Sequence, residues 1–219
     1  MFNKAILWNL SYGVYLVSSL DEGRPIGCIV NSAVQLTHDT IAVSLNHQNY
    51  TNQILKKNKD FAITILSTNI DPNIISLFGF SSSLDRNKFE GLDFQLINNL
   101  PVLTNTIGYI TLNIIKEVEL ETHTLFIAKI TGGDILNNDI PMTYKYYHEV
   151  IKGRAPEKAP TYIATDDIIE SNNVMKSTRY KCKICGYIYE GDISLQDDSF
   201  VCPICKQAKE VFHAIWFCQ

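Results

Sequence analysis

Cysteine is almost absent from most of this 219-residue chain, since only Cys28 of the six cysteines precedes residue 182. Long apolar segments are missing too, because no run approaches the roughly 20 residues that a transmembrane helix needs. The N-terminal segment MFNKAILWNLSYG has no sustained apolar block and no small-residue cleavage site, so it does not resemble a signal peptide. We therefore expect no membrane association and a reducing cytoplasm, where cysteines favour metal or redox roles over disulfides.

An excess of positive charge is also missing. The net charge is −4 and the pI is about 5.7, which argues against nucleic acid as a partner because phosphate binding needs a basic surface. Neither the G-x-G-x-x-G pattern of dinucleotide-binding folds nor the G-x-x-x-x-G-K-[ST] pattern of phosphate loops occurs. The chain does contain 46% hydrophobic residues, which is enough for a packed core.

Short runs of apolar and β-branched residues dominate the chain up to about residue 163. Turn sequences such as DEGRP and THD separate them, and two later runs, IGYITLNIIKEVEL and TLFIAKITGGDIL, flank ETH as in a long hairpin. Strands at this density, without regular helices between them, favour a barrel over a doubly wound sheet. The strands expected before this hairpin are Tyr12–Leu20, Ile26–Leu36, Thr40–Asn46 and Phe61–Leu66.

Two helices are expected to interrupt the strands. One begins at Thr51, whose hydroxyl can cap the first turn. The second is DPNIISLFGF, with Asp71 as its N-cap, proline in the first position and an apolar face. After residue 163 the sequence becomes polar and aperiodic. Residues 164–178 are therefore predicted to link a domain of residues 1–163 to a small domain of residues 179–219.

The small domain contains two Cys-x-x-Cys knuckles that 16 residues separate. The two-residue spacing lets both thiolates of a knuckle face one ion, and two knuckles complete a tetrahedral four-thiolate site. The spacing alone suits zinc as well as iron. Cys28 is expected to be a small core residue and Cys218 a terminal thiol outside the site. The predicted metal ligands are Cys182, Cys185, Cys202 and Cys205.

The residues around these ligands resemble rubredoxin, since YKCKICGYIYEG is similar to its first knuckle and FVCPICKQAKEVF to its second. The resemblance implies one iron ion, with Tyr180, Tyr187, Phe200 and Phe212 as an apolar wrapper. The segment between the knuckles is short, as in the compact domain of rubrerythrins, which favours a more exposed iron. Lys206 stands where the family usually has glycine, so one amide–sulfur hydrogen bond is not assured.

Residues 1–163 resemble the flavin reductase-like family of FMN-binding split barrels, flavoredoxin included. The pieces are SYGVYLVSS, RPIGCIVNSAVQLT, IAVSLNHQNYTNQIL, FAITIL, LFGFSSSLDRNKFEG, LPVL and ETHTLFIAKI, in this order. The resemblance implies a mainly β split barrel with a few helices, bound FMN, NADH or NADPH as electron donor, and a homodimer. Joined to rubredoxin, it resembles the high-molecular-weight rubredoxins, which implies a flavodiiron oxygen or nitric oxide reductase as acceptor.

Several polar residues fit a flavin mononucleotide site. The helix that begins at Thr51 offers amides to a phosphate, and SSSLDRNK offers hydroxyls together with Arg86 and Lys88 as a second phosphate clamp. Thr51 could instead only cap a helix, and the two basic residues could be a solvated pair. The full set of predicted flavin contacts is Asn31, Ser32, Asn46, Tyr50, Thr51, Ser81, Ser82, Ser83, Arg86 and Lys88.

The resemblance also suggests roles for individual residues. It assigns Asn31 and Ser32 to the flavin ring and ribityl chain, with a polar turn as the alternative. It places His123 near the flavin or nicotinamide, with a hydrogen-bonded hairpin histidine as the alternative. The tyrosines of TYKYY are expected in core or dimer packing.

These features together predict an electron-transfer enzyme. NADH or NADPH would deliver a hydride to FMN, and electrons would pass singly to the iron and on to a protein acceptor. Two alternatives stay open: an adaptor that another reductase feeds, and a flavin reductase with a structural zinc ribbon.

Overall fold

The structure is a computed structural model that describes residues 4–151, 179–190, 193, 196–197 and 199–215. The chain divides into a larger compact unit, Ile6–Tyr162, and a smaller one that contains the C-terminal segment from Ile163. We call them the barrel unit and the small unit. The predicted linker, residues 164–178, the boundary at residue 163 and Cys218 lie outside the described residues.

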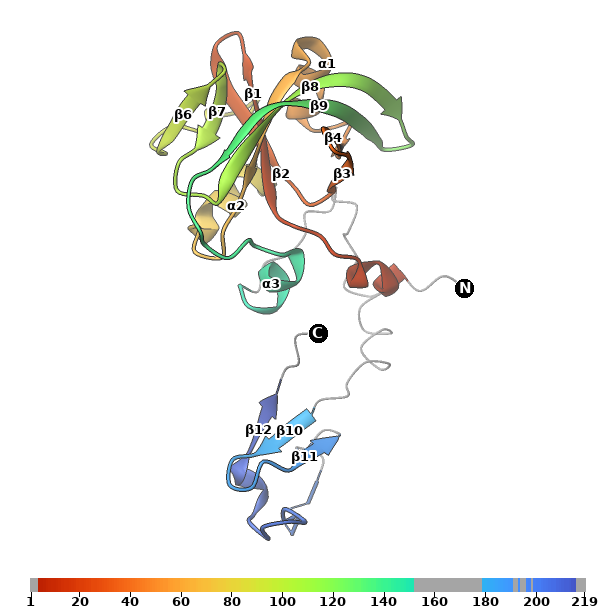
Figure 1. The fold of residues 1–219 in the computed structure, drawn as a ribbon, viewed down its shortest axis with the longest axis vertical. Helices are drawn as coiled ribbons and strands as arrows, with labels where there is room; N and C mark the ends of the chain where they lie inside the picture. Colours follow the sequence, from red (N-terminus) through yellow and green to blue (C-terminus); the bar gives the residue numbers. More distant parts are fainter. Residues whose placement is uncertain (1–3, 152–178, 191–192, 194–195, 198, 216–219) are drawn as a thin grey trace. The chain divides into compact units, whose positions relative to one another are not determined.

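Seven antiparallel strands form the main sheet of the barrel unit, in the order β2-β1-β5-β8-β9-β4-β3 (Figure 1). The edge strands β2 and β3 follow each other in the chain, and only Asn31 and Ser32 separate them. This two-residue connection brings the two edges of the sheet together at one end. The backbone N–H of Ser44 on β4 donates to the carbonyl of Ser32 at 3.0 Å and extends the pairing of β3 with β4 by one residue. The strands are β1 Tyr15–Asp21, β2 Arg24–Val30, β3 Ala33–Thr37, β4 Thr40–Asn46, β5 Asp60–Ile65, β8 Gly108–Glu119 and β9 His123–Ile135.

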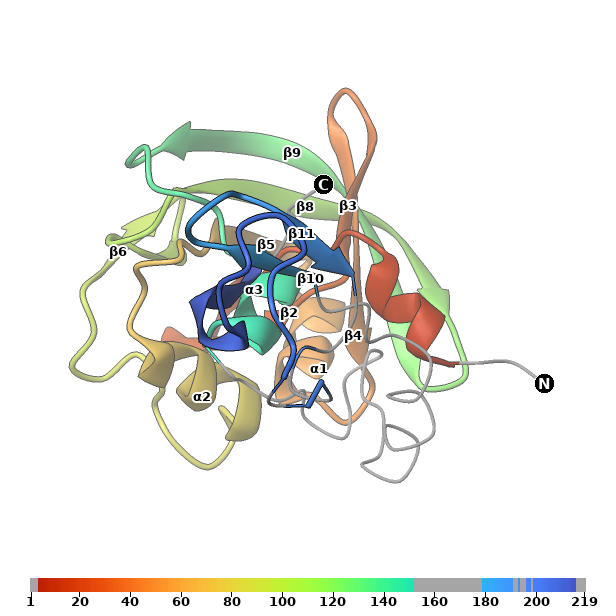
Figure 2. The same ribbon diagram turned by 90° about the horizontal axis from the view of Figure 1, so that it is seen from below.

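The mainly β fold and the long hairpin are therefore confirmed. The hairpin of β8 and β9 arches over one side of the barrel unit, and α2 lies on the opposite side (Figure 2). The run expected as one strand, Ile26–Leu36, is instead two strands, because the chain turns at Asn31 and Ser32 to begin β3. Among the residues described, no helix is long and apolar enough to cross a membrane.

Capping side chains determine where the two longer helices begin. α1 (Tyr50–Asn58) begins one residue earlier than expected, because Asn49, and not Thr51, caps it by accepting the Thr51 N–H at 3.0 Å. α2 (Pro72–Phe80) begins as predicted, with Asp71 as the cap and proline in the first position. The remaining elements of this part of the chain are η1 Lys4–Asn9, α3 Tyr144–Glu149, β6 Phe94–Ile97 and β7 Leu100–Leu103.

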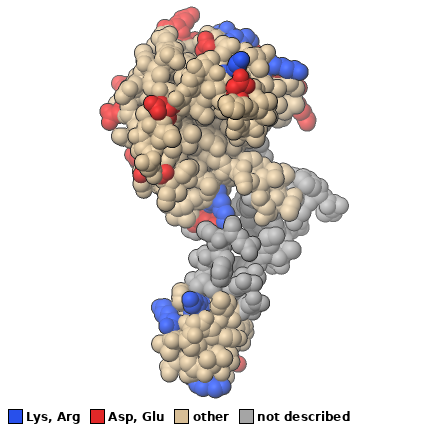
Figure 3. Space-filling model, viewed as in Figure 1, with Lys and Arg blue, Asp and Glu red and all other residues tan. Residues whose placement is uncertain are grey.

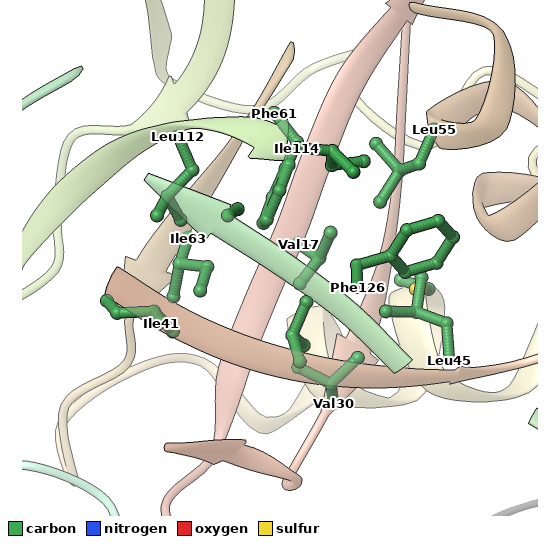
Figure 4. Packing of buried hydrophobic residues seen from close by; sticks show 13 residues of the cluster. Val17, Val30, Ile41, Leu45, Leu55, Phe61, Ile63, Leu112, Ile114 and Phe126 are labelled. Carbon is green, nitrogen blue, oxygen red and sulfur yellow. The ribbon is translucent and has the colours of Figure 1, made fainter. Parts of the chain in front are cut away.

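Two large apolar clusters, and a smaller one around Leu100 and Val102, stabilise the barrel unit. The first fills the barrel with residues such as Val17, Phe61 and Phe126, each of which is fully buried (Figure 4). Full burial of such side chains stabilises the fold by roughly 1.5–3 kcal/mol each. Cys28 belongs to this cluster, as predicted, and burial raises the pKa of its thiol.

The second cluster lies on the outer side of β1, where α2 and α3 cover the barrel. Leu16 of β1, Phe78 of α2 and Tyr147 of α3 belong to it, and Tyr144 and Tyr146 pack against it. The predicted core packing of the tyrosines in TYKYY is therefore confirmed.

The small unit is a three-stranded antiparallel sheet in the order β11-β10-β12. Its core consists of Cys182, Ile193, Cys202 and Phe212, and the predicted aromatic wrapper packs against them. The ring centroids of Phe200 and Phe212 are 5.9 Å apart. The elements are β10 Arg179–Cys182, β11 Ile188–Glu190, η3 Lys209–Val211 and β12 Phe212–Ile215.

Candidate functional site

The four cysteines of the two knuckles form one cluster in the small unit. All four sulfur atoms lie within 4.8 Å of one another. The Sγ atoms of Cys182 and Cys205 are 3.6 Å apart, and those of Cys185 and Cys202 are 3.5 Å apart. Four thiolates at about 2.3 Å from one ion would lie roughly 3.8 Å apart in a tetrahedron. The cluster therefore has the dimensions of a four-thiolate metal site.

Backbone amides point at the sulfur atoms in the same way in both knuckles. The N–H groups of Ile184 and Cys185 donate to the sulfur of Cys182, and those of Ile204 and Cys205 donate to the sulfur of Cys202. Burial alone would raise the pKa of the Cys202 thiol, but these amides and the neighbouring thiols lower it to about 7. Such donors stabilise thiolates, which are the form that binds a metal.

Lys206, which stands where the second knuckle usually has a glycine, adopts the backbone conformation of a glycine. Its φ is 59°, in the left-handed region, and the corresponding Gly186 has a φ of 78°. The next amide, that of Gln207, still donates to the sulfur of Cys205, as Tyr187 does for Cys185. The hydrogen bond that the sequence left unassured is therefore present, because lysine adopts the conformation that glycine would have.

In the barrel unit, the fold brings several predicted flavin contacts to one end of the barrel. Asn46, the last residue of β4, pairs with His123, the first residue of β9. The carbonyl of Ser32 accepts a hydrogen bond from the N–H of Ser44, which lies two residues before Asn46 on β4. The hydroxyl of Ser32 donates to the side-chain oxygen of Asn31 at 3.0 Å. The first turn of α1 adjoins the same region, because the side chain of Thr51 lies beside the thiol of Cys28 on β2.

Two buried polar atoms at this end have no hydrogen-bond partner among the described residues: Thr51 Oγ1 and His123 Nε2. The other ring nitrogen of His123, Nδ1, is 2.7 Å from the hydroxyl of Thr122. Burial, and then the nearby His47, lower the pKa of His123, so its ring is neutral at pH 7. Because unpaired buried polar groups are costly, both atoms are well suited to a bound polar molecule such as a flavin.

The backbone N–H groups in the first turn of α1 are less available to a phosphate than the sequence predicts. Asn49 accepts the Thr51 N–H through its side chain and the Asn52 N–H through its carbonyl. The hydroxyl of Thr51, and not the helix amides, is therefore the unpaired group that the structure offers here.

The segment SSSLDRNK contacts β2 through two of its predicted phosphate ligands. The Ser83 hydroxyl donates to the Gly27 carbonyl at 3.1 Å and accepts its N–H at 3.2 Å. The Lys88 ammonium donates to the carbonyls of Gly27 and Phe78 at 2.9 and 3.2 Å. Ser83 and Lys88 thus fasten this segment to β2 by satisfying buried backbone groups.

The other members of that segment differ in their surroundings. The Ser81 hydroxyl donates to the Leu77 carbonyl at 2.6 Å, and the Ser82 hydroxyl accepts the Leu84 N–H at 3.1 Å. Arg86 is exposed. The phosphate clamp stays a prediction, and Arg86 is its charged member that faces solvent.

Tyr50 is oriented toward the turn between β1 and β2. Its hydroxyl donates to Asp21 Oδ2 at 2.6 Å, and the guanidinium of Arg24 lies 6.0 Å from its ring centroid. Its flavin contact also stays a prediction.

Two residues near the site are not among those that the sequence predicts. His47 follows Asn46, lies near His123 and places its Nε2 3.0 Å from Glu119 Oε2. Asn49 caps α1 and lies beside Cys28. Both lie in the segment IAVSLNHQNYTNQIL, between the end of β4 and the start of α1. Their position just after a strand is the feature of the sequence that could have indicated them.

Comparison with known proteins identifies the family. The profile of the flavin reductase like domain matches residues 7–153, and that of the rubrerythrin, rubredoxin-like domain matches residues 180–213. The chain belongs to the flavin reductase like family. A high molecular weight rubredoxin of Moorella thermoacetica is 33% identical over 95% of this chain and 98% of its own length. The resemblances seen in the sequence are thus confirmed.

A further curated relative and two solved structures are similar to this chain, the structures in fold alone. A ferric-chelate reductase (NAD(P)H) of Archaeoglobus fulgidus is 33% identical over 71% of this chain and 94% of its own length. The fold is shared with an NADH:FAD oxidoreductase of Streptomyces globisporus, with a TM-score of 0.59, 16% identity, and coverage of 64% of this chain and 85% of that one. A flavoredoxin from Methanosarcina acetivorans has a TM-score of 0.54 at 13% identity, over 57% and 69% of the two chains.

Family and geometry together define the chemistry. The protein is an oxidoreductase that combines a flavin-binding fold with a rubredoxin-like domain, whose four cysteines are ligands for one iron ion.

Proposed function

We propose that this protein passes electrons from NADH or NADPH, through FMN in the barrel unit, to the four-cysteine iron of the small unit and on to a flavodiiron oxygen or nitric oxide reductase. The supporting observation is the similarity to a high molecular weight rubredoxin over nearly the whole of both chains. The dimensions of the cysteine cluster support the iron site.

The residues of the barrel unit would hold and orient the cofactor. Asn31, Ser32, Asn46 and the free hydroxyl of Thr51 would bind the flavin, and the neutral ring of His123 would position the flavin or the nicotinamide through Nε2. Bound FMN supplies the chemistry that accepts a hydride as an electron pair and releases single electrons. No proton-transfer residue is required for the hydride step itself.

The small unit would carry single electrons. The six backbone N–H groups that donate to the four sulfurs favour thiolates around one iron ion. Iron held by four thiolates exchanges one electron without changing its ligands.

An anaerobic titration with NADH tests this proposal. Flavin bleaching followed by loss of the ferric iron colour is expected, with a Cys205→Ala variant as a control in which only the flavin bleaches. If NADH and NADPH leave the flavin oxidised, the protein is an adaptor. If the isolated protein contains zinc in place of iron, the small unit is structural.

A second candidate function follows from the similarity to a ferric-chelate reductase, which covers 71% of this chain. The barrel unit would then reduce ferric chelates directly. Ferric-EDTA reduction that is equally fast in the Cys205→Ala variant and in the wild type would favour it.

The cellular location, the oligomeric state and the domain boundaries that we propose are those expected from the sequence. We propose a cytoplasmic protein that forms a homodimer, with residues 164–178 as the linker between domains of residues 1–163 and 179–219. The exposed apolar side chains of Val34 and Leu36 on the edge strand β3 support a contact between copies. Light scattering of the purified protein measures the oligomeric state.

A further inference from the structure

The ring of His123 is held at one nitrogen and open at the other. Its Nδ1 lies 2.7 Å from the hydroxyl of Thr122, in the turn between β8 and β9. Its Nε2 is buried and has no hydrogen-bond partner among the residues that the structure describes. A neutral imidazole has one N–H and one acceptor nitrogen. The bond that Thr122 makes at Nδ1 therefore decides whether Nε2 can donate or accept.

The distance between Thr122 and the ring suits a hydroxyl that donates. Hydroxyl donors typically lie about 2.7–2.8 Å from their acceptor, whereas N–H donors lie about 2.9–3.0 Å away. The 2.7 Å contact matches the first class. Thr122 is exposed, so its oxygen can still accept a hydrogen bond from water. When the hydroxyl donates to Nδ1, the ring hydrogen is on Nε2, and the buried nitrogen is a donor.

The backbone of Thr122 is fixed by neighbouring elements. Its carbonyl accepts the N–H of His47, which follows β4, at 3.0 Å. Glu119, the last residue of β8, lies 2.8 Å from the ammonium of Lys56 on α1 and 3.0 Å from Nε2 of His47. Acidic and basic side chains lie close together on the surface over α1 and the β8–β9 hairpin (Figure 3). These contacts fasten the turn to the barrel unit, so the hydroxyl of Thr122 stays beside the ring.

We propose that Thr122 is a positioning residue that holds His123 in the tautomer with its hydrogen on Nε2, so that Nε2 donates to a carbonyl oxygen of the flavin ring or of the nicotinamide. The inference rests on the proposed function, in which His123 lies beside one of these rings. Both rings carry carbonyl oxygens, and a buried donor without a protein partner gains a hydrogen bond when one of them binds.

Nitrogen-15 NMR of the full, flavin-loaded protein reads the tautomer directly. Ring nitrogens with and without a hydrogen have well separated chemical shifts, and the His123→Gln variant identifies the signals of His123. We expect the wild type to carry the hydrogen on Nε2. In Thr122→Val, the signals should move toward a mixture of both tautomers, because Nδ1 has lost its donor. A wild-type ring with its hydrogen on Nδ1 would overturn the proposal.

Stopped-flow reduction of the flavin by NADH, without oxygen, measures the effect on the reaction. Thr122→Val should slow reduction about fivefold, since one hydrogen bond is lost. Thr122→Ser keeps the hydroxyl and should stay within about twofold of the wild type. The matched control is Thr131→Val, an exposed position on the same strand, whose hydroxyl donates to Thr111 at 2.9 Å. It should change the rate less than about twofold.

Two further measurements identify the ring that accepts the hydrogen bond. Reduction adds negative charge to the flavin, so a donor at a flavin carbonyl raises its reduction potential. A lower potential in Thr122→Val, measured with dithionite and a reference dye, assigns the acceptor to the flavin. An unchanged potential with a higher NADH concentration at half-maximal rate assigns it to the nicotinamide. A change in neither quantity would overturn the proposal.

A double variant tests whether Thr122 acts through His123. Thr122→Val should cause no further loss of rate when it is added to His123→Gln, because the ring that it positions is already absent. The same fivefold loss in that background, or an equal loss in Thr122→Ser and Thr122→Val, would overturn the proposal. A wild-type flavin that NADH does not reduce, together with a lower flavin potential in Thr122→Val, would refute the proposed function alone.

Discussion

Replacing Lys88 with methionine should remove a specific pH dependence from the stability of the barrel unit. The Lys88 side chain is 2% exposed, and burial is the main cause that lowers its pKa from the ordinary 10.5 to about 8. The folded protein therefore releases this proton near pH 8, whereas the unfolded chain keeps it until about pH 10.5. Between these values the unfolded state binds more protons, so the free energy of unfolding rises with pH.

The size of the effect follows from the shift. Each pKa unit is worth about 1.4 kcal/mol, so the full effect is roughly 3 kcal/mol, and about 2.5 kcal/mol of it should develop between pH 7 and pH 10. The stabilisation is complete above the unfolded pKa and is lost as the pH falls through the folded pKa. The methionine variant has no such proton, so its stability should change less over this range.

Urea unfolding of the full chain at pH 7 and pH 10, followed by circular dichroism, measures this difference. The wild type should gain about 2 kcal/mol or more relative to Lys88→Met on going to pH 10. The matched control is Lys145→Met on α3, where the lysine is exposed and no differential gain is expected. A stability difference between wild type and Lys88→Met that is the same at both pH values would refute the assignment of Lys88 to a buried, desolvated site.

Four other changes test separate parts of the structure. Cys182→Ala should abolish iron binding and the red colour while flavin content stays constant, as metal and flavin analysis will show. Retained iron would contradict the four-cysteine site. His123→Gln should slow flavin reduction by NADH about tenfold or more without loss of bound flavin, measured by stopped flow, since the binding groups remain; an unchanged rate would remove His123 from the site. Asn49→Ala should lower the free energy of unfolding by about 1 kcal/mol, because the cap of α1 is lost, and Gln48→Ala, at an exposed position, is its control. Lys206→Gly should raise the thermal stability of the small unit by up to about 1 kcal/mol, because glycine adopts the left-handed conformation with less strain than lysine. A loss of stability would show that the contacts of the lysine side chain stabilise the unit by more than this strain.

Local chemistry made the small unit and the helix starts largely predictable. The four ligands lie in two short knuckles, so their spacing alone indicates one metal site, and Asp71 with its following proline defines the start of α2. The start of α1 was harder, because Asn49 and Thr51 are both good caps and lie two residues apart. Only the backbone conformation shows that Asn49 is the cap.

Contacts between distant parts of the chain could not be predicted from the sequence. The sequence predicts Ser83 and Lys88 as phosphate ligands, because hydroxyl and ammonium groups suit an anion. They bond to Gly27, which lies 56 and 61 residues away. A buried backbone group has the same hydrogen-bonding needs as a ligand, and residue type alone does not distinguish the two. The conformation of Lys206 was unpredictable for a related reason, since the surrounding knuckle imposes it.

The compactness of the cysteine cluster in the sequence has a consequence for biosynthesis. All four ligands come from one stretch of 24 residues that the ribosome makes after the barrel unit. The barrel unit can therefore fold and take up its organic cofactor before any metal is inserted. On the electron path that we propose, a chain whose synthesis stops early would be a reducible protein without an outlet, and its reduced cofactor would be left to react with oxygen.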